Sequence, residues 1–201
     1  MRDGPYARPV ARTYDAITDH LRAWVARQPM FFVASAPLAT DGHVNVSPKG
    51  PGGSLKILGD HRVAYLDIGG SGAETIAHLR ENGRIVVMLC AFEGPPRIVR
   101  FHGRGEAILP DDPRFEELLA EGGFADASLP QARRSIIVVD VTRVSDSCGY
   151  GVPLMTLDGL RDHHALSTEK ALRTLGPDGY AEKRARQNAR SVDGLPAVDS
   201  V

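Results

Sequence analysis

The fold is decided by the stretch from Phe31 to Gly50, which reads FFVASAPLATDGHVNVSPKG. Its first part, Phe31–Ser35, is a short apolar run that is typical of a β-strand. The dipeptide Asp41-Gly42 is a strong signal for a hairpin turn. His43–Ser47 then alternates polar and apolar side chains with the period of a strand. The pattern predicts a β-hairpin that ends at the closing Pro-Lys-Gly of this stretch.

More short strands follow, separated by tight turns. Arg84–Cys90 is apolar on both faces, which predicts a central strand. Six or seven strands, joined mostly by hairpins, predict a mainly β fold of the α+β type. We expect an antiparallel barrel rather than a doubly wound parallel sheet. The remaining strands are expected at Leu55–Leu58, Arg62–Leu66, Arg97–Leu109 and Ser135–Val144.

A few helices are expected around this barrel. Apolar residues recur with helical spacing from Thr13 to Arg27. Gly72–Asn82 is predicted to be a helix closed by Gly83, because glycine favours the left-handed conformation that ends many helices. A short helix is expected after Asp111-Asp112-Pro113, since proline is favoured in a first helical turn.

The character of the chain changes at Cys148. The remainder is polar and contains two weak helical stretches, Thr168–Leu175 and Tyr180–Ala189. Because such a segment rarely folds alone, we expect two parts. Residues 1–147 form the barrel domain with its N-terminal helix, and residues 148–201 form an extension that packs on the barrel or on a second subunit.

Composition excludes several functional classes. A net charge of −1 gives no general attraction to nucleic acid or to an anionic membrane. No apolar run approaches the roughly 18–20 residues that span a bilayer, and Met1–Pro5 lacks the features of a signal peptide. We therefore expect a cytoplasmic protein, in which Cys90 and Cys148 do not form a disulfide. No His, Cys or carboxylate spacing indicates a metal site.

The segment Gly69-Gly70-Ser71-Gly72 is the first candidate binding site. It joins the end of a strand to the start of a helix, where free N–H groups and the helix dipole favour an anion. An alternative is purely structural, because Ser71 and Glu74 have the spacing of a capping box that would satisfy the same N–H groups. On this feature alone, both readings stay open.

A second candidate site is the polar face of the hairpin. His43, Asn45, Ser47 and Lys49 share one face of an extended strand, and a terminal lysine can hold a phosphate through a charge-assisted hydrogen bond. The alternative is a solvated outer face. Polar residues of the C-terminal tail, from Asn188 to Pro196, are also spaced as in a binding loop.

Together these segments resemble the pyridoxamine 5′-phosphate oxidase-like family of FMN-binding split barrels, in particular an oxidase-related branch. The resemblance runs from about Phe31 to Glu106, and the tail from Asn188 to Pro196 resembles the same branch. It implies a split β-barrel, a homodimer and FMN at the subunit interface. By position, Lys49 matches the lysine that ends the family's R-x-V-L-L-K strand, and Arg97 matches the first arginine of its R-Q-V strand.

The resemblance has departures. Val44 stands where the oxidases begin the first motif with arginine, Ile98 replaces the glutamine of R-Q-V, and Ala73-Glu74-Thr75 replaces Ser-Arg-Lys at the helix start. The only tryptophan is Trp24, so the oxidases' C-terminal substrate segment is missing. We therefore do not expect pyridoxamine phosphate to be the substrate.

The function expected from the resemblance is that of an FMN-dependent oxidoreductase of unknown substrate and unknown catalytic residues. The alternative is a barrel that carries flavin, deazaflavin or haem without turnover. The expected cofactor-binding residues are Asn45, Ser47, Lys49, Gly50, Asp67, Gly70, Ser71, Gly72, Glu74, Thr75, Arg97, Asn188 and Arg190.

Overall fold

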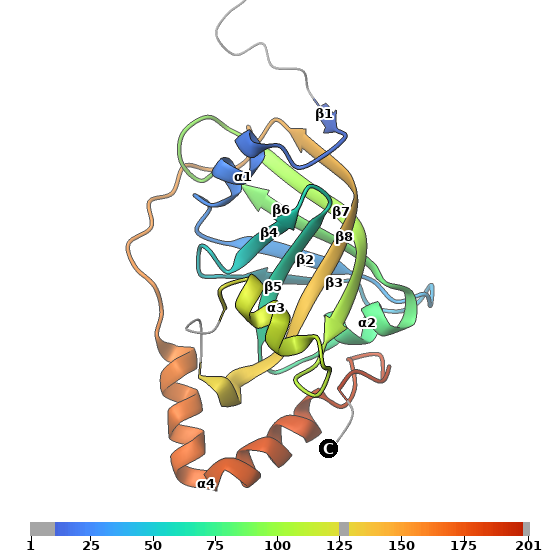
Figure 1. Ribbon diagram of the computed structural model, residues 1–201, viewed down its shortest axis with the longest axis vertical. Coiled ribbons are helices and arrows are strands. Elements are labelled where there is room, and N and C mark those ends of the chain that lie inside the picture. Colours follow the sequence, from blue (N-terminus) through green and yellow to red (C-terminus); the bar gives the residue numbers. More distant parts are fainter. Residues whose placement is uncertain (1–10, 125–128, 199–201) are drawn as a thin grey trace, which may run out of the picture.

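An open antiparallel sheet organises the molecule (Figure 1). The computed structural model describes residues 11–124 and 129–198. The start of the expected barrel domain and the end of the expected C-terminal extension therefore lie outside the described residues. Within these residues eight strands form one sheet, in the order β3-β2-β6-β7-β8-β5-β4, and β1 pairs with β8. Because β3 and β4 end the sheet, the rolled barrel stays split, as expected. The strands are β1 (Ala11–Tyr14), β2 (Phe31–Ser35), β3 (Asn45–Lys49), β4 (Leu55–Gly59), β5 (Arg62–Ile68), β6 (Arg84–Cys90), β7 (Ile98–Ile108) and β8 (Arg133–Ser147).

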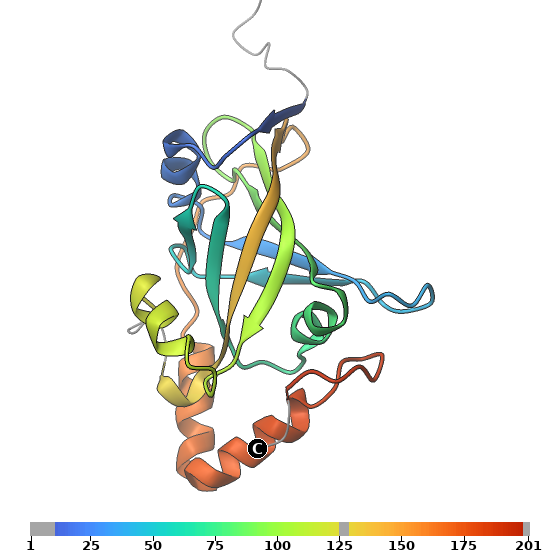
Figure 2. The same ribbon diagram turned by 45° about the vertical axis from the view of Figure 1, so that its right-hand side comes forward.

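Helices lie around the barrel rather than within it (Figures 1 and 2). α4 bends at Gly176, whose φ of 71° and following Pro177 interrupt the helix, so it consists of two halves where two helices were expected. None of the helices in the described part of the chain is long and apolar enough to cross a membrane. The helices are α1 (Asp19–Val25), α2 (Glu74–Asn82), α3 (Phe115–Glu121), the 3₁₀ turn η1 (Pro130–Ala132) and α4 (His163–Asn188).

The predicted start of the first helix is wrong. Residues 11–14 form strand β1, which pairs with residues 144–147 of β8. Thr18 then caps α1 by accepting a hydrogen bond from the backbone N–H of Leu21, so the helix begins only at Asp19. The apolar spacing located the helix correctly, but it could not show the strand pairing that precedes it.

The capping box, which was the structural alternative at the second helix, is absent. α2 begins at Glu74 after Ala73, and no side-chain hydrogen bond caps it. Gly83 ends this helix with a φ of 68°, the left-handed conformation predicted for it. The N–H groups before α2 are therefore not satisfied by Ser71 and Glu74 in the way that the structural alternative required.

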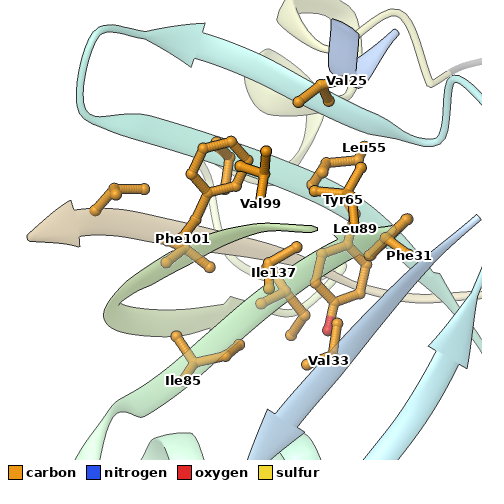
Figure 3. Close-up of a cluster of buried hydrophobic side chains, with 14 of the residues drawn as sticks. Val25, Phe31, Val33, Leu55, Tyr65, Ile85, Leu89, Val99, Phe101 and Ile137 are labelled. Atoms are coloured by element: carbon orange, nitrogen blue, oxygen red, sulfur yellow. The ribbon is translucent and has the colours of Figure 1, made fainter. Parts of the chain in front are cut away.

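The barrel core fixes the strands that carry the site (Figure 3). Phe31 and Val33 of β2 point inward and are 3% and 0% exposed. The ring of Phe31 meets that of Tyr65 from β5 edge to face, with centroids 5.3 Å apart. Burying such side chains contributes about 1.5–3 kcal/mol each, so β2 and its partner β3 are held firmly at this face.

Candidate functional site

Asp67, near the end of β5, is the centre of a buried ion-pair cluster. Its carboxylate accepts a hydrogen bond of 2.8 Å from Nζ of Lys49 and one of 2.8 Å from Nε of Arg134. Asp67 and Arg134 are 3% and 7% exposed, whereas Lys49 is 22% exposed. Burial raises the pKa of Asp67, but the charges of Arg134 and Lys49 lower it more, so the pKa lies below its ordinary value. The cluster therefore carries one net positive charge, with Lys49 on its open side.

The glycine turn that follows β5 is held through its carbonyl groups. The Gly69 carbonyl is 2.8 Å from Nε2 of His164, and the Gly70 carbonyl accepts from Nδ2 of Asn188 at 3.1 Å. The Gly72 carbonyl accepts from the guanidinium of Arg134. In a trans peptide the N–H points away from the carbonyl that precedes it. The N–H groups of Gly70, Ser71 and Ala73 are therefore turned away from α4 and β8.

This arrangement suits an anion at the turn. A Cβ built at Gly70 would meet nothing within 4 Å, so a ligand can approach the backbone closely there. The turn leads directly into the N-terminus of α2, where the helix dipole favours negative charge. Glu74 opposes anion binding at this turn. Its carboxylate folds back into the space where a side chain on Gly72 would lie, and its negative charge would repel an anion there.

The polar face of β3 points toward the barrel and α2. Nδ2 of Asn45 donates to Oγ1 of Thr75 at 3.1 Å and to Oγ of Ser35 at 3.4 Å. The hydroxyl of Ser47 donates to Oδ1 of Asn45 at 3.0 Å. The alternative of a solvated outer face is thus wrong for Asn45, Ser47 and Lys49, because it is Val44 and Val46, 69% and 61% exposed, that face outward. His43, the fourth member of the predicted face, is exposed and lies before β3.

Most candidate residues from the sequence lie together here. Asn45, Ser47 and Thr75 form one hydrogen-bond network, and Lys49 pairs with Asp67 beside it. Asn188, 2% exposed, holds the glycine turn. Three residues contribute less directly: Gly50 follows β3, Ser71 is exposed on the turn, and Arg190 donates to the carbonyl of Gly194 within the tail.

Arg97 does not join this group within one chain. Its guanidinium is paired with Asp146 at 2.6 Å and lies over the ring of Trp24. Ile98, the next residue, pairs with Ser147 at one end of β8, whereas Asp67 pairs with Ser135 at the other end. Arg97 and Lys49 of one chain therefore lie in different parts of the barrel.

Sequence reasoning missed four residues that shape the site: Arg134, His164, Arg184 and His78. Arg184 lies so close to Gly69 that a Cβ there would overlap its guanidinium. His78 is fully buried, and its Nδ1 lies 3.0 Å from Oγ of Ser35. Apart from the glycine at position 69, no local pattern indicated these contacts, since each joins segments far apart in sequence.

Residues 17–148 match the family of pyridoxamine 5′-phosphate oxidase. The chain belongs to this family. It is also 42% identical over 197 residues to the pyridoxamine 5′-phosphate oxidase family protein UstO of Aspergillus flavus, an alignment that covers 93% of this chain and 78% of the relative.

Solved structures with related architecture are more distant. An FMN-binding protein from Syntrophomonas wolfei is 16% identical, with a TM-score of 0.46 over 70% of this chain and 85% of that chain. The haem storage protein HutZ from Vibrio cholerae is 12% identical, with a TM-score of 0.48 over 66% of this chain and 95% of that chain.

Proposed function

We propose that this protein is an FMN-binding oxidoreductase whose substrate is unknown. The observation that carries the proposal is the positively charged Lys49–Asp67–Arg134 cluster, which contacts the Gly72 carbonyl of the glycine turn, together with the Asn45–Thr75 network at the start of α2. An anion-binding turn lies there beside a cation and polar groups, as a phosphorylated cofactor requires. Membership of the family supports FMN as that cofactor.

The residues of this chain fit the phosphate end of such a cofactor. The backbone N–H groups of Gly70, Ser71 and Ala73 would donate to phosphate oxygens, and Lys49 would supply positive charge from the side. When bound, FMN supplies the hydride and electron transfer. The residues named above would hold and orient the cofactor.

The C-terminal extension, residues 148–201, is proposed to complete this site. His164 and Asn188 hold the carbonyls of the turn, and so fix the direction of its N–H groups. Asp193 is hydrogen bonded to His43, which joins the tail to the tip of the β2–β3 hairpin (Figure 2). These contacts support its assignment as a part that packs on the barrel domain.

A second subunit is proposed to cover the outer face of β3, β2 and β6. The strand register places Ala34 between Val46 and Val86, and Phe32 between Pro48 and Met88. These side chains form a continuous apolar surface on the side of the sheet opposite the site. A homodimer, which the family resemblance implies, would bury this surface. A partner subunit would also bring a second copy of Arg97.

A carrier without turnover is the second candidate function. Glu74 favours it, because a carboxylate stands at the helix start where the family's oxidases have a cation. Weaker charge complementarity would suit a deazaflavin or haem as well as FMN. In that case the barrel would bind its ligand without passing electrons to a substrate.

Absorbance and titration test the proposal directly. We expect the purified protein to bind FMN with a micromolar or lower dissociation constant and to reduce it steadily under NAD(P)H. Absence of micromolar FMN binding would contradict the cofactor assignment. Binding without turnover under NAD(P)H or other electron donors would favour the carrier, and titration with a deazaflavin and haem would identify which ligand binds most tightly.

A further inference from the structure

His78 is a buried histidine that the proposed FMN site leaves without a role. It lies on α2 with no solvent exposure, and its Nε2 atom has no hydrogen-bond partner in the part of the chain described. Its Nδ1 atom is 3.0 Å from Oγ of Ser35, which is itself 5% exposed. An enclosed ring cannot touch a substrate, so any effect of His78 on the site must pass through Ser35.

The hydrogen bonds form a continuous chain from His78 to the polar face of β3. Ser35 lies opposite Asn45 in the strand register, and its Oγ accepts from Nδ2 of Asn45. The same amide donates to Oγ1 of Thr75, and its Oδ1 accepts from Ser47. Every link ends on a side chain that the proposed function places at the cofactor.

The direction of each bond in this chain follows from one choice at His78. If Nδ1 is an acceptor, the hydroxyl of Ser35 donates to it and keeps its lone pairs for the amide of Asn45. If Nδ1 carried the proton, the Ser35 oxygen would accept from both neighbours unless the Asn45 amide were turned over to offer Oδ1 to the Ser35 hydroxyl. With Asn45 donating to Ser35, as in this structure, the Ser35 hydroxyl is satisfied when His78 is neutral with its proton on Nε2, an atom that has no partner among the described residues.

We propose that His78 is a positioning residue that fixes the hydrogen-bonding direction of the cofactor site through Ser35 and Asn45. With Asn45 so oriented, Thr75 accepts from it and is left as a donor beside the N-terminus of α2. Ser47 donates to Asn45 and presents free lone pairs. The inference rests on the proposed function. It assigns the site a ligand with an anionic oxygen near Thr75 and a hydroxyl or N–H donor near Ser47.

The environment of His78 supports the neutral ring. Burial lowers its pKa, and the carboxylates of Asp193, Glu74 and Glu81, together with a hydrogen bond to the Ser35 backbone, oppose this only in part. No positive charge is needed for the network, because every donor in it is a neutral hydroxyl or amide.

The first test does not require a cofactor. ¹⁵N NMR of the ring nitrogens in the flavin-free protein at neutral pH should show a protonated Nε2 and an unprotonated Nδ1. A protonated Nδ1, or an imidazolium, would overturn the inference whatever the protein binds.

The second test is a double-mutant cycle on FMN affinity. We expect His78→Leu and Ser35→Ala each to weaken FMN binding about tenfold, the usual scale for a lost hydrogen-bond arrangement, and the double variant to be no weaker than either. His78→Asn, which keeps an acceptor near the Nδ1 position, should restore most of the affinity. Independent effects of the two substitutions, or no effect of Ser35→Ala, would reject the positioning role.

The two tests separate this inference from the function on which it rests. If wild-type protein binds no FMN, the proposed function fails and the NMR result still decides the state of His78. If wild type binds FMN and the cycle is additive, the function stands and the positioning role fails. Should His78→Leu not fold, the smaller Ser35→Ala change and the wild-type spectrum carry the test.

Discussion

The ammonium of Lys49 lies 2.8 Å from the carboxylate of Asp67, across the opening of the split barrel. Lys49 ends β3, the strand at one end of the sheet, and Asp67 lies on β5, next to the strand at the other end. The pair thus joins two strands, β3 and β5, that no backbone hydrogen bond connects in the strand order. It also places the more accessible cation of the cluster beside the proposed phosphate site, so a bound anion and Asp67 would share one lysine.

Replacing Lys49 tests its role toward the ligand. We expect Lys49→Ala to weaken FMN binding by about 1–3 kcal/mol, the cost of losing a hydrogen bond to a charged group. Asp67 remains paired with Arg134, so the fold should persist. Isothermal titration would measure the change, with Lys170→Ala, an exposed lysine on α4, as the matched control. Equal affinities of wild type and Lys49→Ala would show that Lys49 serves only to pair Asp67.

Replacing Arg134 tests the buried side of the same cluster. Arg134→Leu leaves Lys49 as the remaining cation beside the buried Asp67. It also removes the hydrogen bond that Oδ1 of Asn188 accepts from Arg134. Removing one member of a buried ion pair typically costs about 3–5 kcal/mol, so denaturant unfolding should show a loss of that size. Arg62→Leu breaks an exposed pair with Asp140 and should change stability by less than about 1 kcal/mol. Similar losses of stability in the two variants would contradict the conclusion that Arg134 stabilises the fold through the buried cluster.

Local signals explain which features could be predicted from the sequence. The hairpin around Asp41-Gly42 and the helix end at Gly83 depend on residues within a few positions, and both exist as predicted. The predicted strand His43–Ser47 is shifted, however, because β3 runs from Asn45 to Lys49 and a longer loop, residues 36–44, joins it to β2. Arg134 could not be found in this way, because its partners Asp67 and Asn188 lie 67 and 54 residues away. The polar alternation around Asn45 predicted one functional face, but only the pairing of β3 with β2 shows that this face turns inward.

The pH dependence of the tail contact follows from His43. The hydrogen bond and the charge of Asp193 raise the pKa of His43 above its ordinary value, and the same bond lowers the pKa of Asp193. The folded state therefore holds the His43 proton more tightly than the unfolded chain does. The resulting stabilisation is complete below the ordinary histidine pKa of about 6.5 and is lost as the pH rises through the raised value.

An NMR titration of the histidine rings checks this shift. Asp193→Asn should return the pKa of His43 toward about 6.5. The pKa of His102, which burial and the charges of Arg143 and Arg100 lower, should not change. A His43 titration that is the same in both proteins would mean that the tail does not reach the hairpin in solution.

The last prediction concerns the apolar outer face of the sheet. Val46 lies on this face on β3, 61% exposed and opposite Ala34, so a second subunit that covers this face would enclose it. Val46→Glu would place a carboxylate in that interface without touching the core, because the side chain points away from Asn45 and Ser47. Burying an unpaired charge is costly, so the variant should be a monomer where wild type is a dimer in light scattering at the same concentration.

Val192→Glu, at a valine that is 67% exposed on the tail, is the matched control and should stay dimeric. If a partner's residues complete the cofactor site, the monomeric variant should also bind FMN more weakly while it unfolds in the same cooperative way. A monomeric wild type, or a dimer that survives Val46→Glu, would exclude this face as the subunit interface.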